Sequence, residues 1–210
     1  MGFVGRKPTN APLVSSDLGT GIVGSTNIAD GTITNDDIDA SAAIAQSKIA
    51  GSFGKVLQVV QATKTDTTTL SASFADTGIT ASITPSSASN KILIICQITA
   101  TSQDPGGNTI GSYLRLLRNS TDISQGTSAG SRTVLTTEIG GSRGADDSNN
   151  GSIMFLDSPN TTSATTYKIQ ACGRNQGGGG IFYLNRSISD SDANTSSRGT
   201  SNIILLEIAG

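Results

Sequence analysis

The stretch KILIICQITAT, residues 91–101, carries apolar residues on both faces of an extended chain. Successive side chains of a β-strand point to opposite faces. Ile92 and Ile94 would therefore lie on one face, and Leu93 and Ile95 on the other. The β-branched isoleucines favour a strand. Two apolar faces predict a strand at the centre of a β-sandwich or, as the alternative, at a subunit interface.

The same alternation continues on both sides of this stretch. Further strands are predicted at 55–64, 78–84, 109–118, 132–139, 151–157, 165–172, 180–185 and 202–208. Turn-forming clusters such as PSSASN and DPGGN separate these segments, and no helical period intervenes. The last strand repeats the two-faced pattern, with Leu205 on one face and Leu206 on the other. An all-β chain with a jelly-roll-like β-sandwich over 53–210 is predicted.

The composition excludes several classes of protein. The 210 residues carry a net charge of -2 and only 14% charged residues, which does not fit a nucleic-acid-binding protein. No apolar run approaches the length of a membrane span, so no membrane insertion is predicted. The first residues lack the apolar core of a signal peptide, which predicts a protein that stays in the cytoplasm of the producing cell.

The sequence also lacks the usual means of catalysis. It contains no histidine and two cysteines, which we expect to be buried, unreactive thiols. No phosphate-binding glycine motif occurs. The segment DSDANTSS begins with the spacing of a calcium loop, but Thr195 and Ser201 replace the expected glycine and glutamate. We predict no enzyme activity, no cofactor and no metal.

Before the strands, residues 19–52 show isoleucines at steps of five and six. They are Ile22, Ile28, Ile33, Ile38, Ile44 and Ile49. These steps fit neither a helix nor a flat strand. Small polar residues lie between, so the segment cannot form a core of its own. Three chains around a shared axis would bury each isoleucine against its copies, which predicts a trimeric shaft. A short helical turn over 41–51, or a linker with chance spacing, are the alternatives.

Several segments resemble a known family. The opening MGFVGRKPTNAPLVSSDLGTGIVGSTNIADGTITNDDI resembles the anchor and shaft of short bacteriophage virion fibre proteins of the marine and cyanobacterial type. GKVLQVVQATKTDTTTL, YLRLLRNSTDI and FLDSPNTTSATTYKIQ resemble strands of their C-terminal heads. The resemblance implies a non-catalytic homotrimer in the virion, attached by its N-terminus to the tail or neck. It also implies a distal knob that recognises the host surface.

Residues 1–18 would then dock to another virion protein. The residues we expect to make this contact are Phe3, Val4, Arg6, Lys7, Pro8 and Leu13. The apolar ones have no local core, and the two cations suit an acidic partner surface. A frayed terminus is the competing interpretation.

Host contact would fall to the loops of the knob, because recognition residues concentrate on loops held by a rigid scaffold. Arg143, Asn149, Arg174 and Tyr183 are the side chains in or beside these loops best suited to a glycan or protein. A capsid fibre or decoration protein is the main alternative function. A carbohydrate-binding module is more remote, because tryptophan is absent.

Overall fold

The computed structural model describes residues 19–21, 23–39, 41–42, 56–174 and 179–210. The chain divides into two units, Met1–Gly51 and Ser52–Gly210, each of which is considered by itself. The described part of the first unit contains two short 3₁₀ turns, η2 (Ser25–Asn27) and η3 (Asn35–Asp37). Across the described residues, no helix has the length and apolarity needed to cross a membrane.

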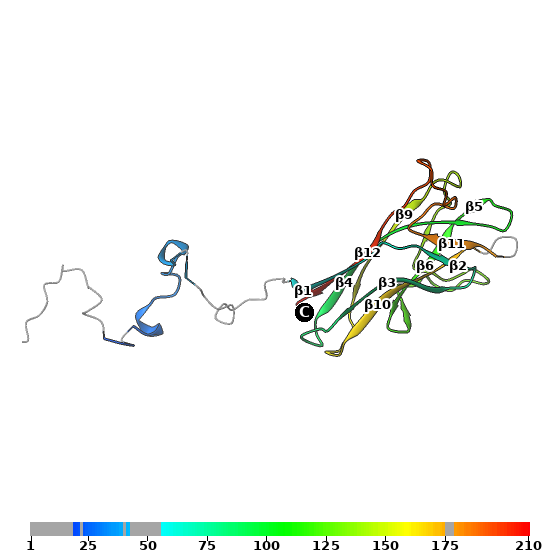
Figure 1. Ribbon diagram of the computed structural model, residues 1–210. Helices are drawn as coiled ribbons and strands as arrows, with labels where there is room; N and C mark the ends of the chain where they lie inside the picture. Colours follow the sequence, from blue (N-terminus) through cyan, green and yellow to red (C-terminus); the bar gives the residue numbers. More distant parts are fainter. Residues whose placement is uncertain (1–18, 22, 40, 43–55, 175–178) are drawn as a thin grey trace, which may run out of the picture. The chain divides into compact units, whose positions relative to one another are not determined.

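The second unit is a β-sandwich of two antiparallel sheets, which face each other in Figure 1. The first sheet has the order β1 (Val56–Lys64), β12 (Ser201–Ile208), β4 (Lys91–Gln103), β11 (Ile181–Leu184), β2 (Thr68–Leu70). Its remaining strands, β5 (Thr109–Ile110) and β9 (Asn149–Asp157), also pair with β4. Since β4 pairs along both of its edges, the strand with two apolar faces is central, as its sequence predicts.

The second sheet is smaller and covers the inner face of the first. Its order is β3 (Ala75–Ile83), β10 (Thr165–Gly173), β6 (Ser112–Arg118), β7 (Thr121–Ile123), and β8 (Thr137–Ile139) pairs with β6. Burial alternates strictly along β3 from Thr77 to Ile83, as expected for a strand with one face on the core. The prediction of a β-sandwich is thus confirmed.

The core lies between the two sheets and is built from inward-facing side chains of both. Its largest fully buried members include Ile92, Ile94, Ile203, Ile79, Leu114, Leu116, Tyr167, Ile169 and Phe182. A polar clamp also joins the sheets through Asp157 of β9. Its carboxylate accepts hydrogen bonds from the Tyr167 hydroxyl at 2.7 Å and from Arg118 at 3.0 Å. Burial, followed by this carboxylate, raises the pKa of Tyr167 and keeps the phenol protonated as the donor.

Most predicted strands are present, with differences at two places. The predicted strand 109–118 is interrupted at Gly111, where a Cβ atom would collide with the carboxylate of Glu138. Of the predicted 132–139, only Thr137–Ile139 form a strand. The sequence did not predict β2 and β7, because three residues are too few to show a period.

Both cysteines are free and buried, as predicted. Cys96 lies in β4 of the first sheet and Cys172 in β10 of the second. Burial raises the pKa of the Cys96 thiol to about 12, and it also raises that of Cys172. The thiolate is the reactive form, so both side chains are unreactive at neutral pH.

Candidate functional site: two uncovered apolar surfaces and a polar loop end

The first unit contains a ten-residue repeat. Segments 19–28 and 29–38 each begin with a tight turn and end with a 3₁₀ turn, at equivalent positions. The turns place Gly21 at φ +76° and Gly31 at φ +77°. Backbone with positive φ strongly favours glycine, so the two glycines ten residues apart set the start of each repeat.

The 3₁₀ turns of the two repeats are closed by equivalent hydrogen bonds. In the first repeat the Gly24 amide donates to Asn27 Oδ1 at 2.9 Å. In the second, the Thr34 amide donates to Asp37 Oδ2 at 2.8 Å. The amide and hydroxyl of Thr34 hold the pKa of Asp37 below its ordinary value. Asn27 and Asp37, ten residues apart, therefore close the 3₁₀ turns of the two repeats in the same way.

The apolar side chains of this repeat are uncovered. Val23 and Ile33 are 52% and 53% exposed, and Ile28 and Ile38 are each 40% exposed. The exposures match pairwise because these residues occupy equivalent positions of the two repeats. We call these four residues the shaft stripe. Nothing in the described part of the first unit covers them.

The residues of the shaft stripe are not the same set as the six isoleucines of the predicted axis. Ile28, Ile33 and Ile38 of the predicted axis belong to the stripe, while Ile22, Ile44 and Ile49 lie outside the described residues. The position equivalent to Ile33 in the first repeat is Val23, which counting isoleucines missed. Aligning GTGIVGSTNI with ADGTITNDDI would have found it, because both the glycines and the apolar positions then coincide.

A second uncovered surface lies on the outer side of the first sheet. Strand register places outward side chains of β1, β12, β4 and β9 in two adjacent rows. The rows are Val59–Leu206–Leu93–Leu156 and Gln61–Ile204–Ile95–Met154. They contain seven apolar residues and no charge, and we call them, together with Val56, Leu57 and Ile208 beside them, the outer apolar face.

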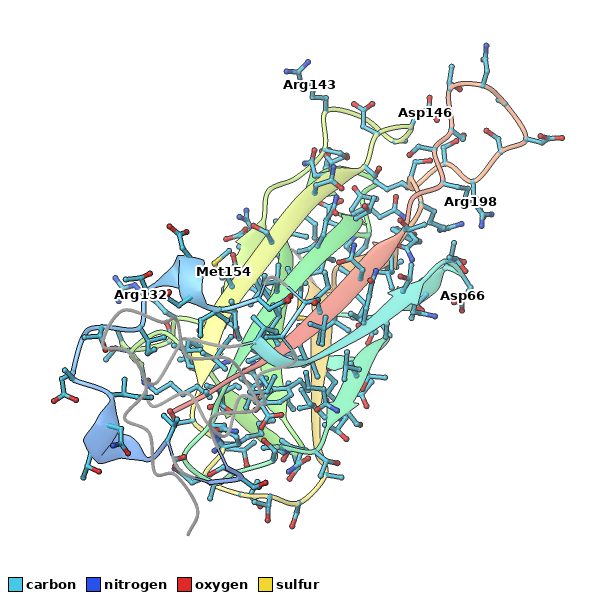
Figure 2. All side chains as sticks on the ribbon, turned by 90° about the vertical axis from the view of Figure 1, so that its left-hand side faces the viewer. Asp66, Arg132, Arg143, Asp146, Met154 and Arg198 are labelled. Atoms are coloured by element: carbon cyan, nitrogen blue, oxygen red, sulfur yellow. The ribbon has the colours of Figure 1, made fainter. Side chains whose placement is uncertain are left out.

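The outer apolar face is most exposed along its two margins. On β1, Val56, Leu57 and Val59 are 51%, 46% and 59% exposed; on β9, Met154 and Leu156 are 72% and 48% exposed. Figure 2 shows Met154 projecting from β9. Every large hydrophobic side chain that is exposed among the described residues belongs to the shaft stripe or to this face.

The face becomes polar toward the other end of the same strands. The next row along consists of Thr63, Asn202, Gln97 and Ser152. At the apolar end, Glu207 turns inward and is 2% exposed. Burial by itself would raise the pKa of Glu207, but hydrogen bonds from Asn90 and Ser86 outweigh it and hold the pKa below its ordinary value. The carboxylate is thus held inside, away from the outer apolar face.

Beyond the polar row, two loops pack together at the end of the sandwich. The Ser189 amide donates to the carbonyl of Ala145 at 2.7 Å, and the hydroxyls of Ser148 and Ser197 lie 3.2 Å apart. Strand β4 begins beside Ile208 and ends beside Ile181, so this loop end is opposite to the end at which β1 begins.

The loop end is held by a pair of arginines around one carboxylate. Asp190 accepts from Arg186 at 2.7 Å and from Arg198 at 2.6 Å. The hydrogen bond from Arg186 is the main cause that lowers the pKa of Asp190. Sequence reasoning had considered Asp190 only as a calcium ligand. In the fold it pairs with Arg186 and Arg198, which lie four and eight residues away in the sequence. Both contacts lie within loops, where no helix or strand periodicity predicts which side chains meet.

The four predicted host-contact residues have different surroundings. Arg143 is exposed at the tip of its loop (Figure 2), whereas Asn149 is half-buried and donates to the Gly140 carbonyl at 2.8 Å. Arg174 lies 3.6 Å from Glu138. Tyr183 is only 7% exposed, and its hydroxyl accepts from Gln103 at 2.6 Å. Tyr183 therefore belongs to the scaffold, and Arg143 is the best placed of the four for an external contact.

The remaining predicted contacts and the comparisons with known proteins add no site. Phe3, Val4, Arg6, Lys7, Pro8 and Leu13 lie outside the described residues. No protein-family model matches the chain. A search of the curated proteins likewise finds no match.

Proposed function

We propose that the protein is a structural component of a phage virion, a homotrimeric fibre docked by its N-terminus to the tail or neck. Residues 19–52 form the shaft, and the β-sandwich is a knob for host-surface recognition. The observation that carries this proposal is the shaft stripe: a repeat of fixed geometry whose apolar side chains recur with equal exposure. The family resemblance of the sequence supports the same function.

The energetics of the shaft stripe favour association of several chains. Burying a large apolar side chain is worth about 1.5–3 kcal/mol, so each half-exposed member of the stripe offers roughly 1 kcal/mol. The stripe residues of one chain have no core to join, and a three-fold axis brings each of them against its two copies. Association thus recovers the burial that the single repeat lacks.

The two ends of the sandwich differ in the way that such a knob needs. Strand β1 begins at one end of the sandwich, and the paired polar loops lie at the opposite end. Exposed loops on a rigid scaffold suit recognition of a glycan or protein. Arg143, with its planar donors, is the side chain we assign first to this contact.

The mass of the full chain in solution tests the proposal. Light scattering after size exclusion should give about three times the 21.3 kDa of the chain. Ile33→Asp places three carboxylates on the axis, where desolvation and repulsion oppose assembly. We expect this variant to lose the trimer or to dissociate at a clearly lower temperature.

The matched control is Thr26→Asp. Thr26 is equivalent to Asp36 in the next repeat, so this position of the repeat already carries a carboxylate in one of its two copies. This variant should assemble like the parent. A parent that is monomeric at all concentrations would overturn the fibre proposal. Labelling of virions with an antibody to the protein then tests the placement: signal at the capsid instead of the tail or neck would contradict the proposed attachment.

A further inference from the structure

We infer that the outer apolar face is the surface through which three copies of the knob meet, with the β9 margin of one copy against the β1 margin of the next. This inference rests on the proposed homotrimer, but it concerns a surface that the shaft does not include. It begins from the difference between the two sheets of the sandwich.

The outer side of β3, in the second sheet, shows what a solvent-facing strand looks like in this protein. Along β3 the outward residues are Asp76, Gly78, Thr80 and Ser82, all exposed and none apolar in side chain. On the neighbouring β10, Lys168 and Gln170 reach Asp76 at 2.9 and 2.8 Å. The first sheet has leucine, isoleucine and methionine at its outward positions, so its outer face differs in kind from the exposed side of β3.

The size and charge of the outer apolar face suit a protein interface. Large exposed apolar patches on soluble proteins mark interaction sites. Five side chains at its margins are 46–72% exposed, so covering them removes a large apolar area from water. Charged residues are depleted at interface cores, and no residue of the two rows is charged. The next outward position of β4 beyond Leu93 is the exposed Lys91, which pairs with Ile208.

The occupant is another copy of the same chain because the shaft brings copies together. Ala42 and Val56 are only 14 residues apart in the sequence, a span of at most about 50 Å. Linked modules of this kind see one another at an effective concentration of about millimolar. At that concentration the outer apolar face of one copy binds the same face of another copy more readily than it binds a separate protein.

Three-fold symmetry then decides which margins touch. A cyclic trimer closes through heterologous contacts, in which one patch meets a different patch on the next copy. The outer apolar face offers two such patches: Val56, Leu57 and Val59 on β1, and Met154 and Leu156 on β9. Between them, the partly buried residues of β12 and β4 would face the axis.

A charge-pair experiment on the full chain tests this arrangement. Val59→Glu and Met154→Lys should each lower the dissociation temperature of the trimer, because each buries a lone charge at the interface. Within one chain these positions are three strand spacings and two residues apart, more than about 14 Å, which exceeds the screening length in about 0.15 M salt. Partial recovery in the double variant would therefore report a contact between copies.

The controls lie two to four residues along the same strands in the polar row. Thr63→Glu and Ser152→Lys carry the same charges on exposed positions of the same sheet. They should leave the trimer unchanged. If the two margin variants behave like these controls while the parent is a trimer, the inference is wrong and the fibre proposal stands.

Met154 supplies a local readout that needs no substitution. Its oxidation by peroxide, followed by peptide mass spectrometry, should be at least tenfold slower in the trimer than in the chain unfolded in urea. A trimer whose Met154 oxidises at the unfolded rate has an uncovered face, which overturns the inference. Protection that appears only after another virion protein is added would assign the face to that partner and would equally overturn it.

Discussion

The two sheets of the sandwich share one kind of inner face and differ in their outer faces. Inward, both present fully buried apolar residues, such as Leu205 of the first sheet and Ile169 of the second. Outward, β3 of the second sheet is polar and exposed, whereas the first sheet carries the outer apolar face. On β6 the outward Leu117 is itself buried. The formation of a core therefore does not by itself explain why the strands of the first sheet are apolar on both faces, because their outward apolar residues do not contact the core.

The largest expected effect contrasts two neighbours on β12. Leu205 is fully buried, so Leu205→Ala should lower the free energy of unfolding by about 2–5 kcal/mol. Leu206 points outward, so Leu206→Ala should leave the far-ultraviolet spectrum intact and weaken assembly instead. Chemical denaturation and light scattering of both variants measure the two effects. Equal losses of folding stability at low concentration would contradict the division of β12 into core and outer faces.

A smaller effect is expected at Glu207, whose side chain points inward at the apolar end of the first sheet. Its pKa in the folded chain lies below the ordinary value of 4.5, so it stabilises the fold at higher pH. This contribution is lost as the pH falls through the lowered value. Glu207→Gln should cost about 1–3 kcal/mol near neutral pH, because the carboxylate accepts from Ser86 and Asn90.

The measurement is denaturant unfolding of parent and variant from about pH 7 to about pH 3. The gap between them should narrow as the pH falls, since protonation removes the advantage of the parent. A gap that stays constant across this range would show that the charge of Glu207 does not contribute to stability.

The smallest effect concerns the shaft, the other region with uncovered apolar residues. Gly31→Ala forces a Cβ into backbone at φ +77° and should cost about 1–2 kcal/mol per chain. Gly24→Ala is the matched control, because Gly24 is extended at φ -104° and its added Cβ would make only ordinary contact with Asn27. The dissociation temperature of the trimer should fall for the first variant only. Similar behaviour of both would contradict the repeat geometry.

Much of the sandwich could be predicted because its strands are long and alternate. The stretch 91–101 was placed at the centre of a sheet from its two apolar faces, and β4 indeed pairs along both edges. Short strands such as β7 show too few residues for a period. The arginine pair around Asp190 was missed, because contacts across a loop depend on how the chain folds back.

The candidate surfaces were predictable in part. Isoleucine spacing pointed to an uncovered stripe, but the position of Val23 in it required the ten-residue repeat and its two glycines. For the outer apolar face, the alternation of residues 202–208 allowed either a central strand or an interface. The structure confirms that β12 is central in its sheet. That it also lies at an interface stays a prediction.

By itself, the sequence determined the local facts: which segments extend, where turns fall, and which residues alternate. These follow from backbone geometry and from the period of two in a strand. The tertiary structure alone decided which apolar face of β4 and β12 meets the second sheet and which is left open. Alternation is symmetric between the two faces, and only the packing of one sheet on the other breaks that symmetry.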